Sequence, residues 1–365
     1  MKNNYKKPEH GGKIYELSRK SGVPVDACTD FSANINPLGP PAWLKEVLLR
    51  GMTQLVHYPD RMSTRLREAI SERFGIGTEK IVAGNGSTEL MYALPRCIKV
   101  KKAIIAVPSY GDYEDAAAMT GLPVDFLQMR EEENFQLNFD ELETRLEKEP
   151  APALVFLGQP NNPTGTALDR ARLIECIERF PKHVFCIDEA FADFIEGEIS
   201  CLGAENENLV VIRSLTKFYA IPGLRLGWLY TKQELASKIR NVLPTWSVNS
   251  IAQTVGARAV LDDGYRTRTL DLLKTERNRL HHSLDLLPSM TILSGEANFL
   301  FGKLEDSNAG VSDIEKYLTG EGIAIRNCSS FRGLSNRYFR IAIRTGTEND
   351  RLINLLRGFF ESRPK

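Results

Sequence analysis

A lysine at position 217 lies in a sequence context that suits nucleophilic chemistry. It follows the apolar run 209–212, has hydroxyl groups nearby at Ser214 and Thr216, and is followed by a second cation at Arg225. A partly desolvated lysine beside another cation has a lowered pKa, so its neutral amine can condense with an aldehyde. Pyridoxal 5′-phosphate is the natural aldehyde, and the hydroxyls and guanidinium would bind its phosphate. A lysine after an edge strand can also be an ordinary exposed side chain. The preceding segments of the sequence are needed to choose between this reading and a cofactor-binding lysine.

Four short apolar runs precede residues that suit this cofactor. Helix-length polar segments separate the runs, which is typical of a parallel sheet covered by helices on both faces. The runs are 103–107, 153–157, 184–187 and 209–212. Just past them stand, in the same order, Tyr110, Asn162, Asp188 and Lys217. Because ligands bind outside the carboxyl ends of strands in open α/β sheets, these four side chains are predicted to meet in one crevice.

The chemistry of these residues matches a pyridine ring. A carboxylate at Asp188, directly behind an apolar run, is costly to bury without a cation or donor, and a protonated pyridine nitrogen is such a partner. Asn162 can donate a hydrogen bond to the ring oxygen, and Tyr110 can lie flat on the ring. Helix capping explains Asp188 or Asn162 taken alone. As a full alternative to a cofactor site, however, a purely structural explanation would have to apply to the residues at all four strand ends at once.

The segment 81–90 is predicted to bind an anion. An apolar stretch leads through a glycine pair into a helix, so the backbone N–H groups of Gly86 and Ser87 would face the ligand. A plain helix cap at Ser87 is the alternative.

The segment 30–41 is punctuated by Asn, Pro and Gly and is predicted to be extended or looped. In an extended chain Asn34 and Asn36 point the same way, either toward a ligand or to cap turns. Helices are expected at about 41–50 and 63–74.

Composition limits the classes of function. The chain has 365 residues with 47 basic and 47 acidic side chains, interspersed, so neither nucleic acid nor an anionic membrane is a predicted partner. No apolar run reaches the roughly 18 residues of a spanning helix and none forms a signal segment, so a cytoplasmic location is expected. The six cysteines form no C-x-x-C pair and are predicted to be reduced and structural. No metal site is predicted.

These motifs resemble those of a known family. Four of them are similar to fold type I pyridoxal-phosphate enzymes of the histidinol-phosphate aminotransferase branch: the lysine segment 213–227, Asn161-Asn162-Pro163-Thr164-Gly165, Asp188-Glu189-Ala190-Phe191 and Gly84-Asn85-Gly86-Ser87. Three further segments resemble the threonine-phosphate decarboxylases of that branch, which act in cobalamin biosynthesis: His10-Gly11-Gly12, 30–39 and 246–249. The likeness covers nearly the whole chain.

The resemblance implies an α/β fold of type I. A large domain would hold a mostly parallel sheet covered by helices, beside a smaller α+β domain. Residues 1–50 would form an N-terminal arm and part of the small domain, 51–265 the large cofactor-binding domain, and 266–365 the small C-terminal domain.

The resemblance also implies a role for each site residue. Lys217 would carry the cofactor covalently and act in catalysis. Pyridoxal phosphate would be bound by Gly86, Ser87, Tyr110, Asn162, Asp188, Ser214, Lys217 and Arg225, together with Tyr58 from the neighbouring subunit of a homodimer. A small phosphorylated amino acid would be bound by His10, Gly11, Asn34, Asn162, Arg326 and Arg340.

At one position the sequence differs from the aminotransferases of this branch in a way that bears on the reaction. Phe191 stands where aminotransferases of this branch have a tyrosine hydroxyl on the ring oxygen, which leaves Asn162 as the main side-chain partner of that oxygen. The cofactor is an electron sink, and the Cα bond perpendicular to its ring breaks fastest. Arginines that hold the carboxylate perpendicular therefore favour decarboxylation, whereas an in-plane carboxylate favours transamination.

Three functions follow for comparison. The prediction is decarboxylation of L-threonine O-3-phosphate to (R)-1-aminopropan-2-yl phosphate, and a histidinol-phosphate-type aminotransferase is the alternative. A catalytically silent pyridoxal-phosphate-binding regulator is a third possibility, but such proteins usually carry an added DNA-binding module, and the chain has no basic helix-turn-helix segment.

Overall fold

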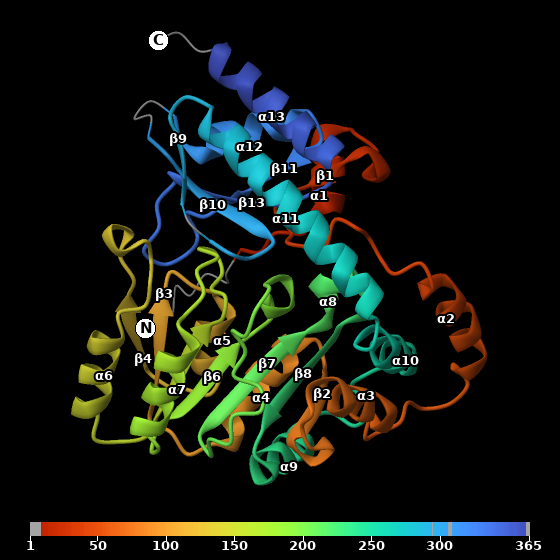
Figure 1. Ribbon diagram of the computed structural model, residues 1–365, viewed down its shortest axis with the longest axis vertical. Helices are drawn as coiled ribbons and strands as arrows, with labels where there is room; N and C mark the ends of the chain where they lie inside the picture. The colour runs from red at the N-terminus through yellow and green to blue at the C-terminus, as the bar shows by residue number, and fades with distance from the viewer. Residues whose placement is uncertain (1–8, 294, 306–308, 363–365) are drawn as a thin grey trace.

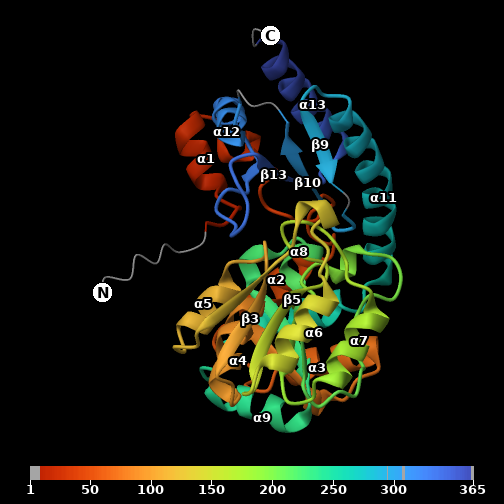
Figure 2. The ribbon, with the colours of Figure 1, turned by 90° about the vertical axis from the view of Figure 1, so that its left-hand side faces the viewer.

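Two lobes lie one above the other in the computed structural model, which describes residues 9–293, 295–305 and 309–362 (Figure 1). The large lobe is built around a seven-stranded sheet, and the small lobe contains a four-stranded and a two-stranded sheet. A long helix, α11 (Asp263–Asp285), runs along one side from the large lobe to the small one (Figure 2).

The seven-stranded sheet has the order β2-β8-β7-β6-β5-β3-β4. Its strands are β2 (Ile81–Asn85), β3 (Lys102–Val107), β4 (Val124–Gln128), β5 (Ala153–Gly158), β6 (Val184–Asp188), β7 (Leu209–Ser214) and β8 (Leu226–Thr231). The pairs from β4 through β7 are parallel, and β8 runs antiparallel to both of its neighbours. The four predicted apolar runs are β3, β5, β6 and β7, so the expected mostly parallel sheet is confirmed.

Helices cover both faces of this sheet. One face packs against α3 (Thr64–Phe74), α6 (Phe139–Lys148), α7 (Arg170–Arg179) and α10 (Ser250–Ala259), the other against α4 (Ser87–Cys97), α5 (Asp112–Ala118) and α9 (Gln233–Val242). Side chains alternate along each strand, so Ile104 belongs to the first core and Ile105 to the second. Burial on both faces explains why these strands read as continuous apolar runs.

The small lobe is built from segments near both ends of the chain. Its four-stranded antiparallel sheet has the order β12-β13-β10-β9, formed by Arg326–Asn327, Tyr338–Ala342, Phe299–Leu304 and Met290–Leu293. Near the N-terminus, β1 (Thr29–Asp30) pairs in parallel with β11 (Ile323–Ala324). The lobe's helices are α1 (Ile14–Ser21), α12 (Val311–Gly320) and α13 (Gly346–Glu361).

The remaining helices are short or connect these parts. α2 (Leu44–Gly51) lies near the expected range 41–50, and the four-residue α8 (Leu215–Phe218) follows β7 directly. Turns of 3-10 helix occur at Val25–Ala27, Met52–Gln54, Thr78–Lys80, Glu131–Glu133, Ala192–Phe194 and Pro222–Leu224. The expected boundary at 265 falls in the first turn of α11, and the division into domains stays a prediction.

No helix in the described ranges is long and apolar enough to cross a membrane. All six cysteines are free thiols.

Candidate active site

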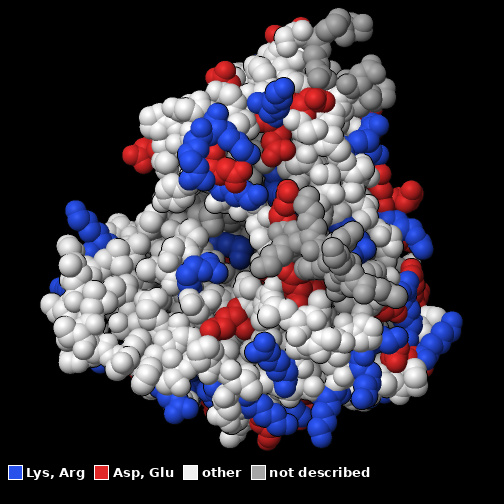
Figure 3. Space-filling model, turned by 180° about the vertical axis from the view of Figure 1, so that it is seen from behind, with Lys and Arg blue, Asp and Glu red and all other residues white. Residues whose placement is uncertain are grey.

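A cavity of about 1060 Å³ lies between the lobes, at the carboxyl ends of β3, β5, β6 and β7. Seen from behind, the molecule is hollowed between its upper and lower parts, with basic side chains inside the hollow (Figure 3). The predicted site residues that line the cavity are His10, Gly11, Asn34, Gly86, Ser87, Tyr110, Asn162, Asp188, Ser214, Lys217, Arg225, Arg326 and Arg340. Tyr58 does not line it.

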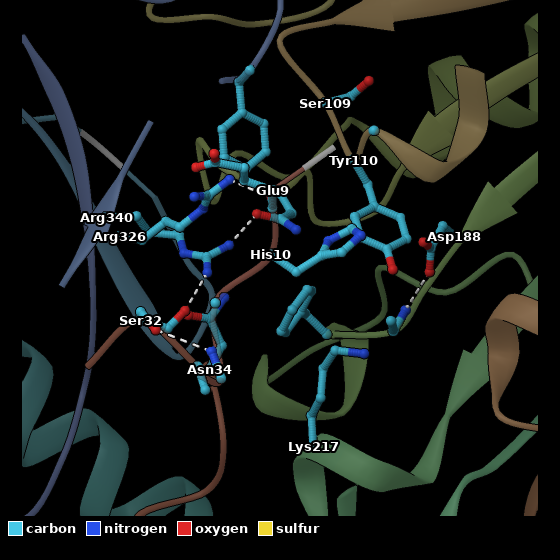
Figure 4. Close-up of a pocket in the computed structure, with 18 of the residues that line it drawn as sticks. Glu9, His10, Ser32, Asn34, Ser109, Tyr110, Asp188, Lys217, Arg326 and Arg340 are labelled. Carbon is cyan, nitrogen blue, oxygen red and sulfur yellow. Dashed lines mark hydrogen bonds between the residues drawn. The ribbon is translucent and has the colours of Figure 1, made fainter. Parts of the chain in front are cut away.

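Lys217 extends its amine from α8 into the cavity (Figure 4). Its Nζ donates a hydrogen bond to Ser214 Oγ at 3.4 Å. Burial lowers the pKa of Lys217; the charge of Asp188 opposes this effect, while Arg225 and Arg340 add to it. The neutral amine is therefore more populated than in an exposed lysine, as a nucleophile requires.

Asp188 is a buried carboxylate at the end of β6. It accepts hydrogen bonds from the Tyr113 hydroxyl at 3.0 Å and from the backbone N–H of Ala190 at 3.0 Å. Within the described part of the chain it forms no ion pair, and burial raises its pKa, an effect that Lys217 partly offsets. A protonated pyridine nitrogen would supply the missing cation, so this site fits the ring of pyridoxal phosphate.

The start of α4 and the side chain of Arg225 form an anion cradle. Gly86 has φ +81°, and a methyl group there would come within 2.7 Å of Arg225 Nη2. The first N–H groups of a helix and a guanidinium thus meet at one point, which favours a phosphate. The hydroxyls of Ser214 and Thr216 lie 2.8 Å apart beside it on the cavity wall.

Arg340 reaches the cavity from β13 with a guanidinium that is fixed but not neutralised. It donates one hydrogen bond to Asn162 Oδ1 and another, of 2.7 Å, to the backbone oxygen of Ser32. Its Nε is buried without a partner, and no carboxylate of the described residues pairs with it. Burial lowers the pKa of Arg340 to about 10. Such a cation is prepared for an anionic ligand.

Arg326 lies next to Arg340 across the pairing of β12 with β13. Its Nη2 donates to Ser330 Oγ at 2.7 Å and to the backbone oxygen of Glu9 at 2.5 Å. Burial lowers its pKa as well. Two buried guanidinium groups on one wall suit a ligand that carries two anionic groups.

Comparison with known proteins identifies the family. The description "Aminotransferase class I and II" matches residues 26–356. The chain belongs to this family. It is 36% identical to the threonine-phosphate decarboxylase of Salmonella typhimurium, with 95% of each chain covered. It is 41% identical to the adenosylcobalamin biosynthesis bifunctional protein CobDQ of Leptospira interrogans over 97% of its own length, but it spans only 41% of that longer protein.

A solved structure agrees with the family and the fold. The histidinol-phosphate aminotransferase of Clostridium acetobutylicum superposes with a TM-score of 0.85 at 30% identity, covering 91% of this chain and 99% of that one. The fold is therefore that of type I pyridoxal-phosphate enzymes, and pyridoxal phosphate is the cofactor of this family.

In this aminotransferase-family chain an N-terminal arm, residues 9–12, crosses the cavity. The imidazole Nε2 of His10 lies 3.2 Å from Asp112 Oδ1, and its ring lies 5.6 Å from that of Tyr110. A methyl group on Gly11 would lie 2.2 Å from the backbone oxygen of Ser32, so only glycine fits this close approach. Figure 4 shows His10 between the two arginines and Tyr110.

Asn34 is buried, and both polar atoms of its side chain lack a partner. An amide that lines a cavity with neither group satisfied is ready for a ligand, because an unpaired buried polar group is otherwise costly.

Tyr58 lies apart from the other predicted residues. Its side chain is 78% exposed and stacks on Trp246, with ring centroids 4.2 Å apart. The predicted contact with a neighbouring subunit's cofactor cannot occur within one chain, so its role stays a prediction.

Several cavity residues were not predicted from the sequence. They are Ser32, Thr88, Ser109, Ser330 and Arg332. Ser109 directly precedes Tyr110, a predicted residue at a strand end, and that position was the available signal. Ser330 and Arg332 lie between β12 and β13, where no local pattern marks them.

Phe191, the predicted departure from the aminotransferase pattern, lies near the lysine. Its ring centroid lies 5.2 Å from Lys217 Nζ, and the side chain is buried. A phenylalanine here offers no hydrogen bond to a cofactor oxygen.

Proposed function

We propose that this chain is a pyridoxal-phosphate-dependent threonine-phosphate decarboxylase, a carbon–carbon lyase of cobalamin biosynthesis. It converts L-threonine O-3-phosphate to CO2 and (R)-1-aminopropan-2-yl phosphate. The observation that carries the proposal is the pair of buried arginines, Arg326 and Arg340, in the same cavity as Lys217. The Salmonella relative is named a threonine-phosphate decarboxylase, and the Leptospira relative is named for adenosylcobalamin biosynthesis. Both names favour decarboxylation over the histidinol-phosphate alternative.

The large lobe supplies the residues that would hold the cofactor. Asp188 would pair with the pyridine nitrogen, and Asn162, whose Oδ1 is engaged by Arg340, keeps its amide N–H groups for the ring oxygen. The phosphate would be bound by Gly86, Ser87, Ser214 and Arg225. When bound, pyridoxal phosphate supplies an electron sink for the bonds of the substrate Cα.

The small lobe would orient the substrate. Arg326 and Arg340 divide the substrate's carboxylate and phosphate between them, because each guanidinium binds one anion by a fork of two donors. Ser32 and Ser330 hold the two side chains in place, so the Cα–carboxylate bond is presented in one direction. After CO2 has left, a proton is delivered to Cα either by a water or by Lys217 in its protonated form, whose lowered pKa makes it a stronger acid than an ordinary lysine.

We also propose a cytoplasmic homodimer in which Tyr58 completes the partner's site. The support is an exposed apolar surface on and after α2, to which Tyr58 belongs. It comprises Leu49, Met52, Leu55, Val56 and Tyr58. Clustered exposed apolar side chains of this kind mark interaction surfaces, and a symmetric dimer covers the same patch on both copies.

The test of the reaction is a product balance. Holoenzyme is incubated with O-phosphothreonine, and CO2, 2-oxo acid and pyridoxamine phosphate are measured in the same samples, with Lys217→Ala as the inactive control. Catalytic release of CO2 is expected. Stoichiometric pyridoxamine phosphate and 2-oxo acid with little CO2 would overturn decarboxylation in favour of transamination.

A further inference from the structure

The N-terminal arm is tied to both lobes. On the small-lobe side, the backbone oxygen of Glu9 accepts a hydrogen bond from Arg326 at 2.5 Å, and the backbone N–H of Gly12 donates to Ser32 Oγ at 3.0 Å. On the large-lobe side, His10 Nε2 reaches Asp112 Oδ1 at 3.2 Å. The side chain of His10 is 48% exposed although it lines the cavity, so the arm lies at the opening.

Asp112 is buried but does not itself line the cavity. It is the first residue of α5 and is 6% exposed, and among the described residues the imidazole of His10 lies 3.2 Å from its carboxylate. A helix start tolerates a carboxylate, but a buried one also needs donors. The pKa of the neighbouring Tyr110 is raised, first by burial and next by the charge of Asp112. The carboxylate is therefore close to both the arm and the ring that is predicted to stack on the cofactor.

We propose that Asp112 is a positioning residue that acts through His10. It holds the imidazole beside Tyr110 and docks the arm across the cavity, so that His10 and Gly11 are in place before the substrate arrives. This inference rests on the proposed function, in which the cavity receives a phosphorylated amino acid. A contact that is already ordered lowers the entropy lost on binding, so loss of Asp112 should raise KM more than it lowers kcat.

Asp115 provides a matched control on the same helix. It is also a buried aspartate, it accepts a hydrogen bond from the Tyr92 hydroxyl at 3.3 Å, and it does not line the cavity. Asp112→Asn and Asp115→Asn each replace one buried carboxylate of α5 by an amide. Only the first change removes the anchor of the arm.

The first measurement is hydrogen–deuterium exchange in cofactor-loaded protein without substrate. The peptide that contains residues 9–21 should exchange several-fold faster in Asp112→Asn than in wild type or Asp115→Asn. His10→Gln alters a half-exposed side chain, leaves α5 intact and should give the same acceleration. Unchanged exchange in both Asp112→Asn and His10→Gln would refute the docking role, whether or not the enzyme is a decarboxylase.

The second measurement is a double-mutant cycle on O-phosphothreonine turnover. Loss of the His10–Asp112 contact predicts a roughly tenfold higher KM for Asp112→Asn, equivalent to about 1.4 kcal/mol, with little change in kcat and none for Asp115→Asn. If Asp112 acts through His10, the His10→Gln/Asp112→Asn double variant has the KM of His10→Gln alone. If the two substitutions instead raise KM by factors that multiply in the double variant, the inference is refuted. Absence of CO2 from wild type would instead refute the proposed function and leave the exchange result standing.

Discussion

Arg340 and Arg213 are equally buried, at 5% and 4% exposure, but have opposite surroundings. Arg213 lies 2.8 Å from Asp193 Oδ1 and 3.0 Å from Glu189 Oε2. Burial acts to lower its pKa, but these two carboxylates raise it overall. Arg340 has no such pair in the described structure, and burial lowers its pKa to about 10. Replacing each by methionine should therefore affect the free energy of unfolding very differently.

The magnitudes follow from the contacts. Lowering an arginine pKa to about 10 corresponds to a penalty of roughly 3 kcal/mol, since a tenfold change in proton affinity is about 1.4 kcal/mol. Arg340→Met removes this penalty together with the hydrogen bonds to Ser32 and Asn162, worth about 1.5–3 kcal/mol each because the donor is charged. The two effects largely offset each other, so the stability of the ligand-free protein should fall by no more than about 3 kcal/mol. Arg213→Met leaves Glu189 buried without its cation and should cost about 3–5 kcal/mol.

Although Arg340→Met should affect stability less than Arg213→Met, it should strongly reduce activity. Without its guanidinium a substrate anion is buried unpaired, and a loss of about 3–4 kcal/mol lowers kcat/KM for O-phosphothreonine by roughly 10²–10³. Urea unfolding of ligand-free protein and CO2 release by holoenzyme measure the two effects. If Arg340→Met destabilises the fold as much as Arg213→Met does, Arg340 is a structural cation, and the view that it awaits an anion is wrong.

Three further predictions concern Lys217 and Tyr58. Cofactor-loaded wild type should be yellow, and borohydride should attach the cofactor to Lys217, whereas label on another lysine would contradict the site. Because burial lowers the pKa of Lys217, the unfolded chain binds a proton there that the folded chain has lost. The stability of ligand-free wild type should therefore rise with pH up to the ordinary lysine value of about 10.4. Urea unfolding of Lys217→Met along the same pH series should show a smaller rise, and an identical slope would argue against a lowered pKa. Mixed dimers of Tyr58→Phe and Lys217→Ala should regain activity, since one site then has both native residues; inactive verified heterodimers would place Tyr58 in its own subunit's chemistry.

The residues at strand ends could be predicted because their position follows from local sequence. Asn162, Asp188 and Lys217 each follow an apolar run, and parallel strands end at the same edge of a sheet. All three line the cavity. Strand β8 was not anticipated, because it returns directly from Arg225 without the helix-length spacer that separates the parallel strands.

Long-range pairings could not be read from the sequence. Arg340 bonds to Asn162 across 178 positions and to Ser32 across 308, and no local pattern encodes such contacts. The motif likeness pointed to Arg340 as a substrate residue, but only the structure reveals that no carboxylate of the described residues pairs with its charge. The contact of His10 with Asp112 depends in the same way on how the arm folds back.

The pairing of β1 with β11 has a consequence for synthesis on the ribosome. Thr29 aligns with Ile323, and at roughly 5–20 residues per second the partner strand emerges on the order of 15–60 s later. The residues proposed to hold the cofactor, from Gly86 to Arg225, all precede that point. A growing chain can therefore assemble its cofactor pocket while Arg326 and Arg340 are still unmade, and the ability to recognise substrate is acquired last.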